Sequence, residues 1–240
     1  RRMLYVTHLD AAMPSKAQQR YLLASAVAGV AAAIRIIRRR NMHTPPKPLP
    51  SNFPVTPADV VDAANRVKPH VHRTPVLTCN GLDELAGRSL KFKCEVFQRT
   101  GSFKIRGATN AALQAPENAP LVTHSSGNHA QALALAARST GREAHVVMPR
   151  TAPAVKRAAV EGYGAQITLC EPTNAARAEA AQKKTEEVAG YFVHPSNEPR
   201  VISGQGTVAY EFLEQCADLD ALVAPVGGGG LIGGIAVYAK

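Results

Sequence analysis

The stretch "PLVTHSSGNHAQALALAARSTGREAHVVMP", residues 120–149, decides the fold class. Two short apolar runs flank an alanine-rich segment, and alanine favours helix. Small polar residues and glycine separate the three parts, as is typical of turns. A strand, a helix and a second strand in this order predict a βαβ unit, and therefore a parallel pair of strands.

The same alternation extends to both sides of this stretch. Strands are predicted over 90–96, 165–172, 191–195 and 221–226, and helices over 57–67, 102–115, 152–164, 174–190, 206–216 and 231–240. This pattern predicts an α/β protein with a mostly parallel sheet. Ligands of such folds bind beyond the carboxyl ends of the strands, so we expect the chemistry in the strand-to-helix turns.

The net charge of +10 is concentrated outside the regular part of the chain. Residues 1–47 hold nine Lys or Arg and one acid, whereas the rest holds nineteen bases and seventeen acids. Because the excess positive charge lies in the tail and not on the folded part of the chain, the sequence argues against nucleic-acid binding. The four cysteines form no CxxC pair. His70 and His72 could be a pair of metal ligands, but the stretch that holds them is interpreted as a loop. We therefore predict no metal site in this chain and a reducing, cytoplasmic location.

Residues 1–54 form a basic tail and linker without the regular pattern. An apolar run over 22–34 is shorter than a membrane span requires. Basic residues follow it, and a proline-rich linker covers 44–54. The tail fits an organelle-targeting segment, a membrane-proximal anchor, or translated sequence absent from the mature protein, and these alternatives stay open.

The first chemical turn is "QRTGSFKIRG", residues 98–107. Lys104 lies in the first turn of a predicted helix that has Ser102 as its candidate N-cap. Burial and the positive helix end both disfavour an ammonium group, so the pattern suits a reactive amine that forms a Schiff base. The alternative is an exposed helical lysine.

The second and third turns offer groups for anions. Ser125, Ser126 and Asn128 lie where a strand runs into a helix, and suit a carboxylate unless they only cap the helix. Four glycines, 227–230, lie between an apolar strand and an apolar helix, where their peptide N–H groups can surround a phosphate. The spacing also satisfies GxGxxG, so a dinucleotide-binding oxidoreductase is an alternative. An amine, a carboxylate site and a phosphate cradle together indicate pyridoxal phosphate acting on an amino acid.

The motifs "TGSFKIRGA", "SSGNHAQAL" and "PVGGGG", in this order, resemble the fold-type II pyridoxal-phosphate enzymes, in the serine racemase and serine/threonine dehydratase branch. The linking stretches "HRTPVLT" and "VHPSNEPRVISGQGT" are similar too, and the resemblance runs from about residue 55 to the end. It implies a tryptophan-synthase-β-like fold of two lobes. The large lobe is expected over 55–119 and 198–240, and the small lobe over 120–197.

The resemblance implies a role for each matching position. Lys104 matches the lysine that holds the cofactor and moves protons on one face of the substrate, and Phe103 precedes it as in the family. Asn128 matches the residue that hydrogen-bonds the pyridine hydroxyl. The substrate carboxylate is expected in the turn that holds Ser125, Asn128 and His129. The phosphate cradle matches Gly227, Gly228, Gly229 and Gly230.

Ser126 bears on the type of reaction. Racemases of this branch resemble "SSGNH", and so do some hydroxyaspartate dehydratases, whereas biosynthetic threonine dehydratases resemble "SAGNH". Racemisation needs a proton donor on each face of a planar carbanion, and Lys104 with Ser126 is the minimum pair. The resemblance therefore implies a serine racemase activity with serine/threonine dehydratase activity beside it. A threonine dehydratase, a hydroxyaspartate dehydratase and an inactive truncated paralogue are the alternatives.

The family usually continues for about a hundred residues beyond the glycine cradle. We therefore expect an incomplete large lobe, with a possible divalent cation such as Mg²⁺ bound through residues absent from this chain. The family also implies a homodimer and a small amino-acid substrate. Membrane contact by the tail stays open.

Overall fold

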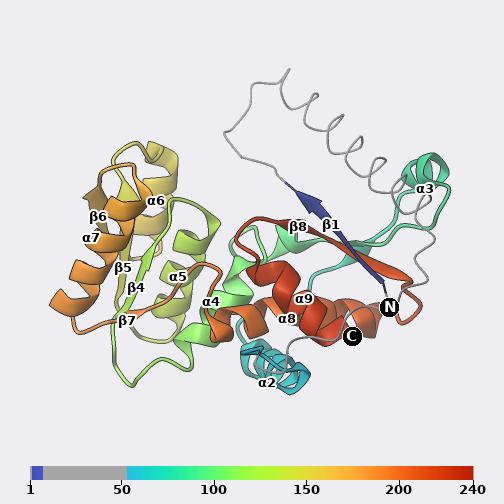
Figure 1. Cartoon of the computed structure of the whole chain (residues 1–240), viewed down its shortest axis with the longest axis horizontal. Coiled ribbons are helices and arrows are strands. Elements are labelled where there is room, and N and C mark those ends of the chain that lie inside the picture. The colour runs from blue at the N-terminus through green and yellow to red at the C-terminus, as the bar shows by residue number, and fades with distance from the viewer. Residues whose placement is uncertain (1, 8–52, 240) are drawn as a thin grey trace.

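The structure, a computed structural model, describes residues 2–7 and 53–239 (Figure 1). A parallel sheet with its helices occupies one end of the molecule, and a second group of helices and strands occupies the other. Helix α4 (Lys104–Ala112) lies between the two groups. The molecule is therefore elongated, with Lys104 near its middle.

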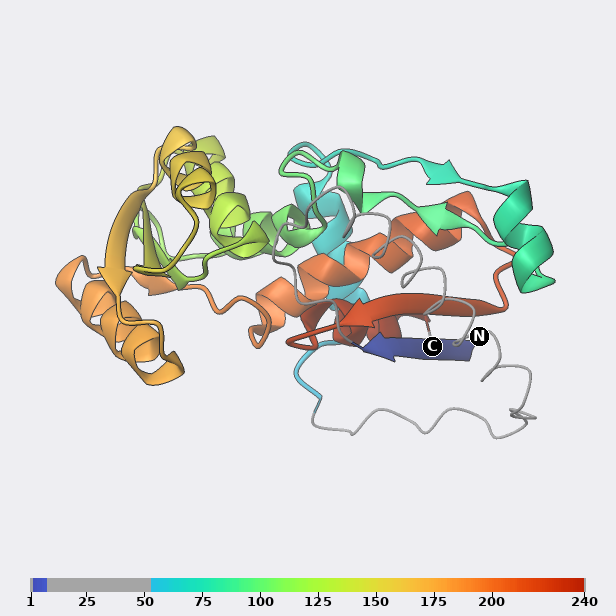
Figure 2. The same ribbon diagram turned by 90° about the horizontal axis from the view of Figure 1, so that it is seen from above.

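The first group is a four-stranded parallel sheet. Its strands follow the order β6-β5-β4-β7, with bounds β4 Leu121–His124, β5 Ala144–Pro149, β6 Gln166–Cys170 and β7 Tyr191–Phe192. All three pairings are parallel, and Leu121 of β4 lies opposite both Ala144 and Tyr191. The helices of this group are α5 (Asn128–Ser139), α6 (Ala154–Gly162) and α7 (Asn174–Glu187). Figure 2 shows α7 on one face of the sheet and α5 with α6 on the other. The predicted parallel βαβ arrangement is confirmed.

The second group surrounds two long helices. Its helices are α2 (Pro57–Val67), α3 (Asn80–Ala86), the 3₁₀ helix η1 (Glu95–Phe97), α8 (Pro199–Gln215) and α9 (Gly230–Ala239). Strands β2 (Val76–Leu77) and β3 (Phe92–Lys93) pair antiparallel. Strand β8 (Ala221–Val226) pairs parallel with β1 (Arg2–Thr7), a strand that the sequence analysis did not predict.

Helix α4 forms the centre of the packing. Each of its residues after Lys104 is buried, and the helix packs against both α5 and α8. A Cβ atom on Gly204 of α8 would lie only 2.6 Å from the Cα of Gly107, so the two helices touch through their backbones. This close contact places the first turn of α4 in a fixed position relative to α8.

Several local predictions were wrong. The strand expected over 90–96 is only Phe92–Lys93 before η1 begins, and α8 starts at Pro199 rather than at residue 206. Ser102 does not cap α4, because the N-cap is Phe103 and the helix has no side-chain cap. The helix over 57–67 is confirmed, and its capping box of Thr56 and Asp59 explains its start.

The apolar run 22–34 lies outside the described residues. Within the parts that are described, no helix has both the length and the apolar character needed to cross a bilayer. The proposed lobe boundaries, near residues 119 and 197, stay predictions.

Candidate active site

Lys104 is half-buried at the start of α4. Its Nζ donates a hydrogen bond to the carbonyl oxygen of Pro195, at 2.7 Å. Burial lowers the pKa of Lys104 from 10.5 to about 8. The positive end of the helix acts in the same direction. Lys104 is therefore a half-buried lysine that loses its proton more easily than an exposed one, and it has a larger neutral fraction at physiological pH.

Pro195 belongs to a short loop, His194–Asn197, which we call the strap. The strap follows β7 and leads into α8. Inside it, Nδ1 of His194 accepts hydrogen bonds from the backbone N–H of Ser196, at 3.1 Å, and of Asn197, at 2.8 Å. These bonds require an unprotonated Nδ1. Burial comes first among the causes that lower the pKa of His194, and the charge of Lys104 adds to it.

The strap also packs against the tetraglycine turn, Gly227–Gly230. A Cβ atom on Gly228 would lie 2.8 Å from the Cβ of Ser196, and one on Gly230 would lie 2.8 Å from the Ser196 carbonyl oxygen. One residue of the strap thus contacts the turn while its neighbour binds the lysine amine. The strap therefore links Lys104 to the tetraglycine turn.

The tetraglycine turn has the features of an anion cradle. It joins β8 to α9, whose first residue is Gly230. Gly229 has a φ of +84°, a conformation that other residues rarely adopt. A Cβ atom on Gly227 would meet nothing within 4 Å, so this side of the turn is open. Backbone N–H groups at the start of α9 suit a phosphate.

The β4–α5 turn holds the polar residues that the sequence singled out. The N-cap of α5 is Gly127, and no side chain caps the helix, so the capping alternative for Ser125, Ser126 and Asn128 is wrong. The hydroxyl of Ser125 accepts a 3.3 Å hydrogen bond from the N–H of Gly127. Ser126 is half-buried and Asn128 is exposed. Both side chains are therefore accessible to a ligand.

His129 is placed differently from a typical carboxylate-binding side chain. It is only 2% exposed, and burial, followed by the charge of Lys104, lowers its pKa to about 3. The ring is therefore neutral at physiological pH. A contact with the substrate carboxylate would have to come from its backbone N–H in the first turn of α5, not from a charged imidazole.

Two hydroxyl groups before Lys104 were not predicted as site residues. The hydroxyl of Thr100 and that of Ser102 are buried and have no hydrogen-bond partner among the described residues. Buried polar atoms are usually paired, so unpaired ones beside a reactive amine indicate a missing polar ligand. In the sequence, only the presence of two hydroxyl residues just before Lys104 could have suggested this role.

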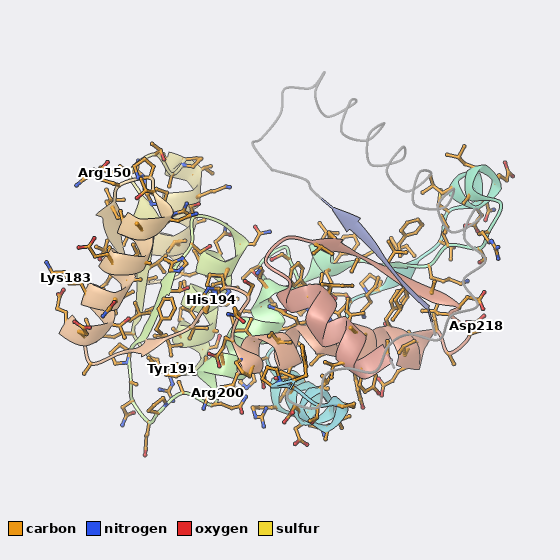
Figure 3. All side chains as sticks on the ribbon, viewed as in Figure 1. Arg150, Lys183, Tyr191, His194, Arg200 and Asp218 are labelled. Atoms are coloured by element: carbon orange, nitrogen blue, oxygen red, sulfur yellow. The ribbon has the colours of Figure 1, made fainter. Side chains whose placement is uncertain are left out.

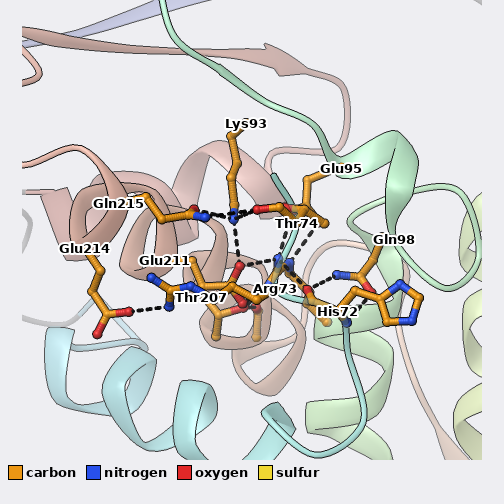
Figure 4. Close-up of polar contacts among 12 residues, drawn as sticks. His72, Arg73, Thr74, Lys93, Glu95, Gln98, Thr207, Glu211, Glu214 and Gln215 are labelled. Atoms are coloured by element: carbon orange, nitrogen blue, oxygen red, sulfur yellow. Dashed lines mark hydrogen bonds and ion pairs between the residues drawn. The ribbon is translucent and has the colours of Figure 1, made fainter. Parts of the chain in front are cut away.

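A buried ion network holds α4 from its other side (Figure 4). The fully buried guanidinium of Arg106 pairs with Glu95 of η1 at 2.8 Å and with Glu211 of α8 at 2.7 Å. Lys93 of β3 also pairs with Glu211, at 2.7 Å. Burial opposes ionisation of Glu211, but the hydrogen bonds from Arg106 and Lys93 hold its pKa below the ordinary value. Two cations and two anions balance, so the network fixes α4 without net charge.

Residues 67–240 match the family described as "Pyridoxal-phosphate dependent enzyme". The chain belongs to this family. Its fold is that of the fold-type II members, and the match favours pyridoxal phosphate over the dinucleotide alternative.

The relatives of this chain include both racemases and dehydratases. The chain is 52% identical over 189 residues to human serine racemase, covering 76% of this chain and 56% of that protein. It is 52% identical over 179 residues to the β-hydroxyaspartate dehydratase of Paracoccus denitrificans, covering 73% and 57%. The structure of serine racemase from Dictyostelium discoideum superposes with a TM-score of 0.75 at 44% identity, covering 78% and 62%. The chain thus spans little more than half the length of the curated relatives that it matches.

The residues of this site fit the cofactor of the family. The amine of Lys104, the open cradle at Gly227 and the unpaired hydroxyls of Thr100 and Ser102 provide an amine, a phosphate site and spare polar groups. In the described part of the chain, no group of three or more His, Cys, Asp or Glu side chains could hold a metal ion.

Proposed function

We propose that this chain contains the catalytic lysine of a pyridoxal-phosphate-dependent serine racemase that also dehydrates serine and threonine. The observation that carries the proposal is the lowered pKa of Lys104 next to a strap that touches the tetraglycine turn. An exposed lysine, or one distant from an anion cradle, would not support this chemistry.

The cofactor, when bound, supplies an electrophilic carbon for the substrate amine and withdraws electrons from the substrate Cα. Lys104 would hold the cofactor and then, as a neutral amine, remove or return the Cα proton on one face. Its pKa of about 8 is near the range in which a general base is effective at physiological pH. Gly227–Gly230 would hold the phosphate, Phe103 and Asn128 would contact the ring, and Ser125 and the backbone of His129 would contact the substrate carboxylate.

Ser126 supports racemisation over simple elimination. Its side chain is half-buried in the β4–α5 turn and is not used as a helix cap. A hydroxyl there can donate a proton to the face opposite Lys104. A hydroxyaspartate dehydratase remains the second candidate, because one such relative is as similar to this chain as a serine racemase is.

The full 240-residue chain, supplied with pyridoxal phosphate and L-serine, tests this proposal. Chiral analysis should detect D-serine together with pyruvate and ammonia. We expect Ser126→Ala to lower D-serine formation at least about tenfold and pyruvate formation much less, because elimination needs no donor on the second face. Ser125→Ala is the matched control and should lower both products alike.

Only keto acid from wild type would favour a dehydratase, and faster turnover of hydroxyaspartate than of serine would favour the second candidate. No turnover despite bound cofactor would support the inactive paralogue. A homodimer and a cytoplasmic location complete the proposal.

A further inference from the structure

The two ends of the strap are joined by three side chains, Tyr191, Glu198 and Arg200, which we call the clamp. Tyr191 is the first residue of β7, Glu198 is the N-cap of α8, and Arg200 lies in the first turn of α8. The Tyr191 hydroxyl donates to Glu198 at 3.3 Å and accepts a hydrogen bond from Nη1 of Arg200. The Arg200 guanidinium also lies over the Tyr191 ring, 5.2 Å from its centroid. Figure 3 shows Tyr191, His194 and Arg200 gathered where the sheet end of the molecule meets α8.

The beginning of the strap is fixed to the parallel sheet. The N–H of Val193 donates to the carbonyl of Val122 at 2.8 Å, and the Thr123 hydroxyl donates to the carbonyl of Val193 at 2.8 Å. The end of the strap is not part of the sheet. It depends on the clamp, and on the two hydrogen bonds that Nδ1 of His194 accepts within the strap.

The clamp is connected to the helix that carries Lys104. Nδ2 of Asn110, on α4, donates to the carbonyl of Arg200 at 2.6 Å and to the Ser203 hydroxyl at 3.1 Å. Arg66 of α2 donates to the other amide atom of Asn110 at 2.7 Å. A closed ring of contacts therefore runs from Lys104 through the strap and the clamp to α8, and back to α4 through Asn110.

We propose that Tyr191, Glu198 and Arg200 are positioning residues, which hold the strap so that the Lys104 amine and the tetraglycine turn keep a fixed separation. The inference rests on the proposed function, since that function gives the separation its purpose: one ligand has to reach both the amine and the turn. Opening the clamp frees the end of the strap, so that the Pro195 carbonyl leaves the amine and water reaches it.

The proposal predicts a change in the titration of Lys104 that can be measured without cofactor. Burial is the cause of its lowered pKa, so hydration of the amine raises the pKa towards 10.5. Besides Lys104, the titratable and charged groups around this part of the site are His124 of β4, His129 of α5, His194 of the strap, and Tyr191, Glu198 and Arg200 of the clamp.

Trace labelling of the full chain with acetic anhydride from pH 6 to 11, followed by peptide mass spectrometry, gives the midpoint for each lysine. In wild type we expect a Lys104 midpoint near 8. In Tyr191→Phe and Arg200→Met the midpoint should rise by about half a pH unit or more, which lowers Lys104 labelling at pH 7 about threefold. Arg200→Lys should recover part of the difference.

Two controls separate a local effect from a general loss of packing. Arg150→Met removes an exposed ion pair with Glu171 on the sheet end of the molecule, and should leave the Lys104 midpoint unchanged. Lys93, buried in the Arg106 network, is an internal reference whose labelling should not change.

An unchanged Lys104 midpoint in both clamp variants would overturn the inference. So would a parallel shift of Lys93 in both variants, because the clamp would then act on the whole fold. A wild-type midpoint near 10.5 would instead contradict the proposed function itself. The two failures are therefore distinguishable in one experiment.

Discussion

Lys104 combines a covalently competent amine with an environment that disfavours its charge. Its hydrogen bond to Pro195 does not select a protonation state, since both an amine and an ammonium group can donate to a carbonyl. Burial lowers the pKa to about 8, so the neutral fraction at physiological pH is much larger than that of an exposed lysine. The neutral His129 and His194 nearby add no positive charge to the site at physiological pH.

A buried lysine of this kind makes the stability of the fold depend on pH. The folded pKa of about 8 lies below the unfolded value of 10.5, so the unfolded chain binds more protons between these limits. The free energy of unfolding should therefore rise with pH across this window, by up to about 3 kcal/mol from this one group.

We expect Lys104→Met to be more stable than wild type at pH 7, by about 1–3 kcal/mol, with the difference shrinking towards pH 10.5. Urea unfolding at pH 7 and pH 10 measures this difference. Lys183→Met, on the exposed surface of α7, is the matched control and should differ equally from wild type at both pH values. If Lys104→Met and wild type differ by the same free energy of unfolding at pH 7 and pH 10, burial does not shift the pKa of Lys104.

Single site residues could be predicted where the residue type itself is unusual in its local sequence, but not where the role depends on three-dimensional packing. The sequence pointed to Lys104 and to the tetraglycine turn, because each is unusual in its local context. It was wrong for Ser102, which leaves its hydroxyl unpaired instead of capping α4. It also could not show that the ring of His129 faces the interior, since that depends on how α5 packs against α4.

The strap is the element on which the site depends most, and sequence periodicity could not reveal it. It follows a strand of only two residues and has no regular structure of its own. Its importance comes from contacts between residues far apart in the chain, Lys104 with Pro195 and Ser196 with Gly228. Longer elements such as α2 and α5 were predicted well, because their alanine-rich or amphipathic patterns extend over several turns.

The contact between the strap and the tetraglycine turn can be tested by substituting one residue on each side of it, Gly228 and Ser196. Gly228→Ala places a Cβ atom 2.8 Å from the Cβ of Ser196, so the strap must move. We expect a loss of stability of about 1–3 kcal/mol and weaker binding of pyridoxal phosphate.

Adding Ser196→Gly to Gly228→Ala removes both Ser196 side-chain atoms that the new Cβ atom meets, and should recover most of the lost stability. Thermal unfolding of the two single variants and the double variant completes the cycle. Strict additivity would mean that the two residues do not oppose each other across this contact.

Across the whole molecule, α4 links the parallel sheet to the group of helices that holds the glycine cradle. The Arg106 network and the Gly107–Gly204 contact fix α4 to α8 on one side, and the alanine-rich face of α5 packs on the other. The sequence predicted the α/β class and the parallel sheet, which follow from local patterns. It did not predict the pairing of β1 with β8 or the Arg106 network, because both join segments far apart in the chain.

The most direct test of the account is to trap the cofactor on the protein. The full chain is incubated with pyridoxal phosphate, reduced with borohydride, digested and mapped by mass spectrometry. We predict one pyridoxyl group, on the peptide that contains Lys104, and its loss in Lys104→Ala. Labelling that is spread over surface lysines, and equal in wild type and Lys104→Ala, would contradict the account.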